Sequence, residues 1–319
     1  MKIRPGSTLA LLLLGPFGVS GVFADAASWE DLQRQSKALA QQDNYSQAAE
    51  VGEQALKAAE DKFGPDDPRV AWVLSDLSTI ESARGDYSKA EALGIRGVQV
   101  SEKLKVPDPK LLGLCLRNLG TIYRDKGKFP EAEANLQRAL GVFEKALGPE
   151  HPLVGTCLHD QAYLYQIQGK FSEAEPLLNR ALEIAQKAPQ FDPSELAALL
   201  GHQADNLLAL HKTQEAIPLY ERSLAIREKI LGPDHIRVAR SSYSLARAYA
   251  VAGKYKEAEP LYKRALEIMY EQNYGGDSPE ILLWRKAYAL VLRKVGKAKE
   301  AEALEAMSKG VQEKGEGQR

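Results

Sequence analysis

The chain has 319 residues, and its 42 basic and 43 acidic residues give a formal net charge of −1 at pH 7. This balance provides no global attraction to polyanions, so neither nucleic acid nor an anionic membrane surface is expected as a partner.

The first 24 residues have the layout of a secretory signal peptide. Lys2 and Arg4 precede an apolar run at residues 9–14, and small residues mark possible cleavage after Ala24 or Ala26. The run is short for a bilayer span, so an uncleaved anchor is the weaker alternative. No later segment is apolar enough to cross a membrane. We therefore expect an exported bacterial protein, periplasmic or secreted, without a membrane span once the signal is removed.

Residues 28–311 repeat with a period of 42. Small residues recur in register at Ser36, Ser78, Gly120, Ala162, Ala204, Ala246 and Ala289, where only the last step is 43. A turn signature of glycine, lysine or aspartate, and an aromatic residue recurs at Gly85-Asp86-Tyr87, Gly127-Lys128-Phe129, Gly169-Lys170-Phe171 and Gly253-Lys254-Tyr255. Degenerate copies begin at Asp43, His211 and Gly296. A fixed period of this length predicts a solenoid.

Each repeat has the pattern of two helices. In residues 116–123 apolar side chains follow the spacing of one helix face, and Gly127 ends that helix because glycine accepts the left-handed conformation. A second helix begins near Pro130 and stops at the breaker cluster of residues 147–152. We therefore predict an all-α, right-handed solenoid of about seven antiparallel helix pairs, with turns near residues 43, 85, 127, 169, 211, 253 and 296. Residues 312–319 are expected to form a polar tail.

The repeat resembles the tetratricopeptide repeat, in the 42-residue form found in kinesin light chains. The resemblance is carried by Asn118-Leu119-Gly120, Tyr123, Gly127-Lys128-Phe129, Glu131-Ala132-Glu133, Arg138-Ala139-Leu140 and the breaker at residues 147–152. It implies that the first helix of each pair lines a concave groove that binds a protein or peptide. Ligand choice lies at positions that the motif leaves variable.

The variable positions of the first helices supply the candidate binding residues. They are Arg117, Asn118, Arg124, His159, Asp160, Tyr163, His202, Asp205, Arg240, Tyr243, Arg247, Lys286 and Arg293. Asn118 matches the asparagine with which resembled families hold a peptide backbone. The last two repeats, with Lys294 added, present five cations and no acid at these positions, which predicts a ligand of acidic character.

Motifs for catalysis are absent from the sequence: there is no glycine-rich phosphate loop, Cys-x-x-Cys, His-Glu-x-x-His or Gly-x-Ser-x-Gly. His151 and His235 occupy equivalent linker positions and are expected to cap helices. His159 and His202 lie near Asp160 and Asp205, a set that includes metal-ligand types. Their spacing lacks a tight local pair, so a solvated polar groove explains them equally well, and we expect no metal and no cofactor.

Cys115 and Cys157 are 42 residues apart, at equivalent positions of neighbouring repeats. Stacked helices lie roughly 8–10 Å apart, whereas a disulfide needs Cα atoms about 4.4–6.8 Å apart. We therefore expect two buried free thiols.

These patterns predict a non-catalytic scaffold that recruits a protein or peptide in the groove. The alternative is a self-associating structural subunit of a cell-envelope assembly, which would expose apolar side chains on the convex face or the terminal helices. An enzymatic role would need a site or cofactor that the sequence does not contain.

Overall fold

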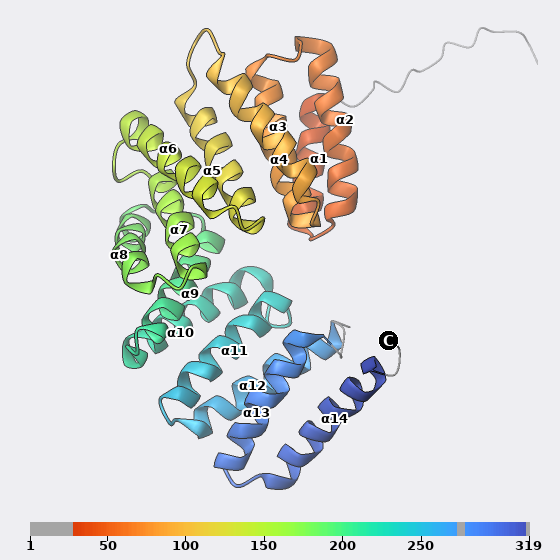
Figure 1. Cartoon of the computed structure of the whole chain (residues 1–319), viewed down its shortest axis with the longest axis vertical. Coiled ribbons are helices and arrows are strands. Elements are labelled where there is room, and N and C mark those ends of the chain that lie inside the picture. The colour runs from red at the N-terminus through yellow and green to blue at the C-terminus, as the bar shows by residue number, and fades with distance from the viewer. Residues whose placement is uncertain (1–27, 273–277, 317–319) are drawn as a thin grey trace, which may run out of the picture.

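The computed structural model describes residues 28–272 and 278–316, and every regular element in these ranges is an α-helix (Figure 1). In chain order the helices are α1 (Trp29–Gln41), α2 (Tyr45–Phe63), α3 (Pro68–Arg84), α4 (Tyr87–Glu102), α5 (Pro109–Asp125), α6 (Phe129–Leu147), α7 (Pro152–Ile167), α8 (Phe171–Lys187), α9 (Pro193–Ala209), α10 (Thr213–Leu231), α11 (Ile236–Val251), α12 (Tyr255–Glu271), α13 (Pro279–Lys294) and α14 (Ala298–Glu316).

Consecutive helices form seven antiparallel pairs, and all seven turns lie where the 42-residue period predicts them. The central residue of each turn has a positive φ. In five turns it is a glycine, but in the first and fifth it is Asp43 (φ 58°) and His211 (φ 62°). Both therefore adopt the left-handed conformation that glycine accepts without cost. The expectation of an all-α solenoid of helix pairs is confirmed.

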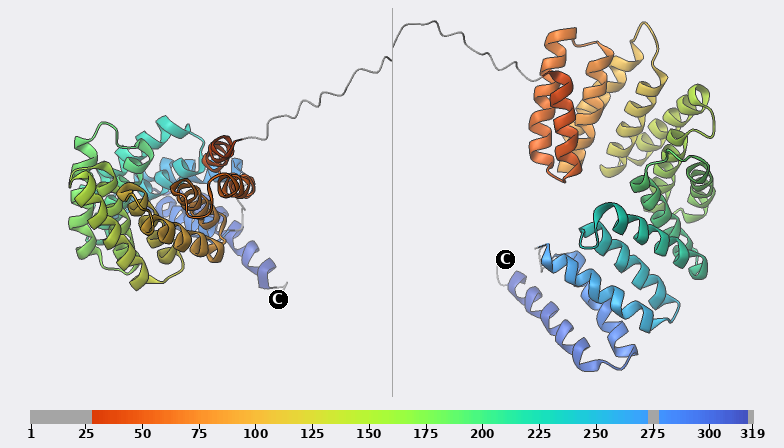
Figure 2. Two further views of the ribbon diagram at one scale, coloured as in Figure 1. Left: turned by 90° about the horizontal axis from the view of Figure 1, so that it is seen from above. Right: turned by 180° about the vertical axis from the view of Figure 1, so that it is seen from behind.

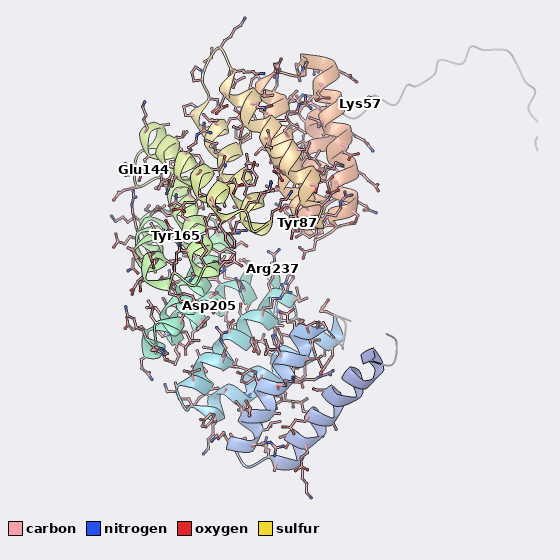
Figure 3. All side chains as sticks on the ribbon, in the orientation of Figure 1. Lys57, Tyr87, Glu144, Tyr165, Asp205 and Arg237 are labelled. Carbon is pink, nitrogen blue, oxygen red and sulfur yellow. The ribbon has the colours of Figure 1, made fainter. Side chains whose placement is uncertain are left out.

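The pairs stack into a curved array (Figures 1 and 2). The first helices of the pairs, here called the inner helices, are α1, α3, α5, α7, α9, α11 and α13. The array curves so strongly that the turn of the first repeat meets the start of α11, where Arg237 Nη2 lies 3.4 Å from Asp43 Oδ1. In Figure 3, Arg237 points toward the first repeats, whereas Lys57 and Glu144 lie on the outer side of the array.

Small residues allow the two helices of a pair to cross closely. A Cβ added to Gly120 of α5 would lie 2.8 Å from Leu136 Cγ of α6, and Ala132 is fully buried at the same crossing. The apolar core divides within α9. One cluster extends through Leu199, and a second begins at Ala204.

The second helices of the pairs, here called the outer helices, are joined by ion pairs between residues 36 positions apart. The arginine of one repeat pairs with the glutamate of the preceding one in Arg96–Glu60, Arg138–Glu102, Arg180–Glu144 and Arg264–Glu228. Arg222 occupies the same place in the fifth repeat, but residue 186 opposite it is a glutamine. This outer series is therefore interrupted between α8 and α10, close to the division of the core.

The linker histidines cap helices as expected. The Nδ1 atoms of His151 and His235 accept hydrogen bonds of 3.1 Å from the backbone N–H groups of Leu153 and Arg237. Cys115 and Cys157 are buried free thiols, as expected from their spacing of 42 residues.

Two expectations concern the ends of the chain. The signal-peptide segment, residues 1–24, lies outside the described residues. At the other end α14 continues to Glu316, beyond residue 311, where the repeats were expected to end. No helix within the described ranges is long and apolar enough to cross a membrane.

Candidate binding surface on the inner helices

Two positions of each inner helix connect it to its neighbours. We call the residue three places before the recurrent small residue the forward residue. The residue two places before it is called the backward residue. The forward residue of one repeat contacts the backward residue of the following repeat, 43 residues later. The pairs are Gln33–Asp76, Ser75–Asn118, Arg117–Asp160 and His159–His202. Together they form an inner ladder that runs from α1 to α9.

The ladder places a histidine pair at the centre of the inner surface. His159 Nε2 and His202 Nδ1 are 2.6 Å apart, so one ring nitrogen donates to the other. The ring of Tyr163 stacks on His202 with centroids 4.4 Å apart and planes at 6°, and the Arg124 guanidinium carbon lies 4.8 Å from the Tyr163 centroid. Burial lowers the pKa of His159 to about 3 and that of His202 to about 4, so both rings are neutral near pH 7.

Arg117 and Asp160 form the charged step of the ladder. Arg117 Nε lies 2.5 Å from Asp160 Oδ2, and only 19% and 12% of the two side chains are exposed. Burial lowers the pKa of Arg117, but the nearby Asp160 and Glu195 carboxylates outweigh it and raise the pKa above its ordinary value. Arg124 Nη1 is 4.0 Å from the other Asp160 oxygen. Asp160 is thus held between two arginines.

Asn118 also belongs to the ladder. Its Nδ2 donates to Ser75 Oγ at 2.9 Å, and the residue is half-buried. The amide that the resemblance assigns to a ligand backbone is therefore engaged with the preceding repeat in this structure.

The histidines and carboxylates near the centre do not converge. Asp160 faces arginines, while Asp205 accepts from Tyr220 Oη at 2.6 Å and pairs with Arg247. Among the described residues there is no group of three or more His, Cys, Asp or Glu side chains placed to hold a metal ion. The polar groove that was the other interpretation is also less solvated than expected, because His159 and Asp160 are buried.

The cations of the last two repeats correct one expectation. Arg240 pairs with Glu280, Arg247 Nη2 lies 2.8 Å from Asp205, and Arg293 pairs with Glu305. The expectation counted acids only at the equivalent inner positions of the last two repeats, where there are none, but carboxylates at other positions pair with these three cations. The carboxylates come from neighbouring helices, which a comparison of equivalent positions does not reveal.

Beyond α9 aromatic stacking replaces the ladder. Gly201, the forward residue of α9, has no side chain, and Tyr243 of α11 instead stacks on Trp284 of α13 with centroids 4.6 Å apart. Sequence reasoning placed Tyr243 on the inner surface but did not identify Trp284 as its partner. The C-terminal residues of α7 and α11, Ile167 and Val251, are 46% and 62% exposed.

Comparison with known proteins supports the interpretation of the fold. The model of the Tetratricopeptide repeat family matches residues 32–103, 114–187, 195–271 and 245–312. Among curated proteins no significant match is found.

Solved structures show the same architecture. The putative kinesin light chain repeat protein of Podosopora anserina is 28% identical, with a TM-score of 0.55, and the match covers 66% of this chain and 98% of that one. BtubC (BKLC) from P. vanneervenii is 23% identical over 76% of this chain and 92% of its own, with a TM-score of 0.58. The apo form of RapI is 13% identical over 90% and 98%, with a TM-score of 0.62. The last two likenesses concern the fold alone.

The family model covers more than half of the chain, and the helix pairs, the turn residues and the small-residue crossings agree with it. The chain therefore belongs to the tetratricopeptide repeat family.

Proposed function

We propose that this protein is a non-catalytic scaffold that recruits a protein or peptide segment on its inner surface. Tetratricopeptide repeats are generally protein-interaction scaffolds. Within such a fold, ligand choice depends on the inner side chains rather than on the repeat motif.

The proposal rests on one observation: some inner side chains connect neighbouring repeats, whereas others are exposed and available to a ligand. The ladder residues are buried or half-buried and hold the repeats together, so the surface beside them is preorganised. The exposed apolar residues Ile167 and Val251 follow Tyr163 and Arg247 by four positions, so they lie on the same helix faces as these two inner residues. Arg247 is itself exposed. A rigid surface with apolar and charged groups reduces the ordering cost of binding a flexible segment.

We place the acidic end of the ligand near α11 and α13. Arg240 and Arg247 each keep 46% of their side chain exposed despite their ion pairs. Cations on a concave surface focus positive potential, which speeds association with an acidic segment. Binding should weaken with salt, because exposed charges are screened beyond about 8 Å at physiological ionic strength.

A peptide library displayed on phage, selected against the purified protein, tests the proposal. The selected peptides are then measured against Arg247→Glu and against Arg222→Glu, a matched charge reversal on the exposed outer face of α10. We expect loss of affinity only for Arg247→Glu. Equal loss for both variants would contradict the placement of the site on the inner surface. Selected peptides without acidic residues would contradict the acidic character of the ligand. Thermal unfolding checks that Arg247→Glu remains folded beside Asp205.

For location, we propose export with cleavage after Ala24 or Ala26, supported by the basic, apolar and small-residue order of residues 1–26. Mass determination of the protein recovered from cell fractions tests this. A cytoplasmic protein that retains Met1 or Lys2 would contradict it.

A further inference from the structure

Three side chains of α13 face away from α11 and contact no further inner helix within the described residues. In earlier repeats three positions face the next inner helix. The first is the residue six places before the small residue, such as Arg240, which pairs with Glu280. The second is the forward residue, such as Arg117, which pairs with Asp160. The third is the residue directly after the small residue, such as Tyr163, which stacks on His202. In α13 these positions hold Leu283, Lys286 and Leu290. No inner helix follows them within residues 278–316.

These three residues form one stripe on α13. Because they are three and four residues apart, they lie on one face of the helix, over a length of about 10 Å. Leu283 and Leu290 are 58% and 66% exposed. At the position of Leu283, the third repeat has Leu114, which packs against the core. The stripe therefore has the apolar character of a packed face but is open to solvent.

The charge of the stripe specifies what would cover it. Lys286 is exposed, and none of the described carboxylates forms an ion pair with it. Two cations of the inner surface that face forward meet a carboxylate at the backward position of the next inner helix. Lys37 meets Asp76 at 2.8 Å, and Arg117 meets Asp160 at 2.5 Å. A helix that covers Lys286 with the same geometry would place an acidic residue opposite it.

We propose that Leu283, Lys286 and Leu290 dock an amphipathic helix of a partner protein, which continues the array as an eighth inner helix. The partner helix carries a carboxylate opposite Lys286 and apolar residues on either side of it. Within the described residues this surface is the face of α13 that points away from α11. Ile167, Val251, Arg240 and Arg247, which carry the proposed function, are not part of this stripe, so the proposal does not depend on that function.

Charge disfavours a second copy of this chain as the occupant. Head-to-tail stacking would place Arg34, the backward residue of α1, opposite Lys286. Arg34 pairs with Asp31 of its own helix, but its side chain is 76% exposed. Edge-to-edge stacking of two copies would bring Lys286 against its own equivalent. Like charges at a contact cost affinity, so a partner of different sequence fits better.

Two stapled helical peptides of about four turns provide the probe. Both carry leucines at the spacing of Leu283 and Leu290, but one has glutamate between them and the other lysine. Fluorescence anisotropy with the purified protein should show about tenfold tighter binding of the glutamate peptide. Lys286→Glu should invert this preference, and Leu290→Ser should weaken binding of both peptides. Lys299→Glu, an exposed charge reversal on α14, should change nothing.

Three results would overturn the proposal. One is an unchanged preference in Lys286→Glu, and another is an equal effect of Lys299→Glu. The third is a concentration-dependent dimer in sedimentation equilibrium that Leu290→Ser abolishes, because it would assign the stripe to a second copy. Arg247→Glu should leave peptide docking intact, so failure of the groove proposal and failure of this one are distinguishable.

Discussion

The inner helices are connected in two different ways along the chain. From α1 to α9 each inner helix contacts the next through a polar pair 43 residues apart, and at the centre one member of each pair is buried and the other half-buried. From α9 to α13 the connections include the ion pairs Arg247–Asp205 and Arg240–Glu280 and the stack of Tyr243 on Trp284. The difference shows that polar residues on an inner helix are not automatically ligand contacts, because in the first five repeats many of them hold the scaffold.

The largest expected effect contrasts one ion pair from each region. Arg117→Ala leaves the buried Asp160 without its closest cation and should reduce the free energy of unfolding by about 3 kcal/mol. Arg247→Ala removes a pair whose side chains are 46% and 41% exposed, so the loss should stay below about 1 kcal/mol. Urea unfolding measures both. Similar losses would mean that the two regions do not differ in the way described.

The second test uses the histidine step of the ladder. The folded pKa values of His159 and His202 are about 3 and about 4, below the ordinary value of about 6.5. Between these values the unfolded chain binds protons that the folded chain does not, so stability falls as pH falls. Each histidine should contribute a loss of about 2 kcal/mol between pH 7 and pH 5.

His202→Gln should remove its own share of this pH dependence. His235→Asn keeps a capping acceptor outside the ladder and should retain the full dependence. Urea midpoints from pH 4 to pH 7.5 give the profiles, and identical slopes for His202→Gln and the unmodified protein would refute the assignment.

The period of 42 was sufficient to predict the seven turns, the close crossings at residues such as Ala132 and the capping role of His151. Each depends on a residue's place within its own repeat. The inner ladder depends instead on side-chain direction between repeats, and its spacing of 43 differs from the period. The carboxylates that offset Arg240, Arg247 and Arg293 also lie on other helices, so equivalent positions did not reveal them.

The close crossing between the two helices of a pair should be equally tight in both regions. Ala132→Leu in the third repeat and Ala258→Leu in the sixth both overpack a crossing at a fully buried position. Each should cost about 1–3 kcal/mol, whereas Ser172→Leu at an exposed turn position should cost much less. Equal costs at Ala132 and Ala258 would localise the difference between the regions to the inner contacts. A cost for Ser172→Leu as large as theirs would show that the crossing is not the cause.

The smallest effect concerns the turn next to the point where the two regions meet. His211 holds φ at 62°, a conformation that costs a residue with a Cβ roughly 1 kcal/mol relative to glycine. Its ring forms no side-chain hydrogen bond among the described residues, so His211→Gly should stabilise the protein by about 0.5–1 kcal/mol. Asp43→Gly relieves the same backbone cost but removes the contacts of Asp43 with Tyr45 and Arg237, so its gain should be smaller. Thermal unfolding of both variants compares them. A loss of stability in His211→Gly would mean that the imidazole contributes more to the fifth repeat than its strained backbone costs.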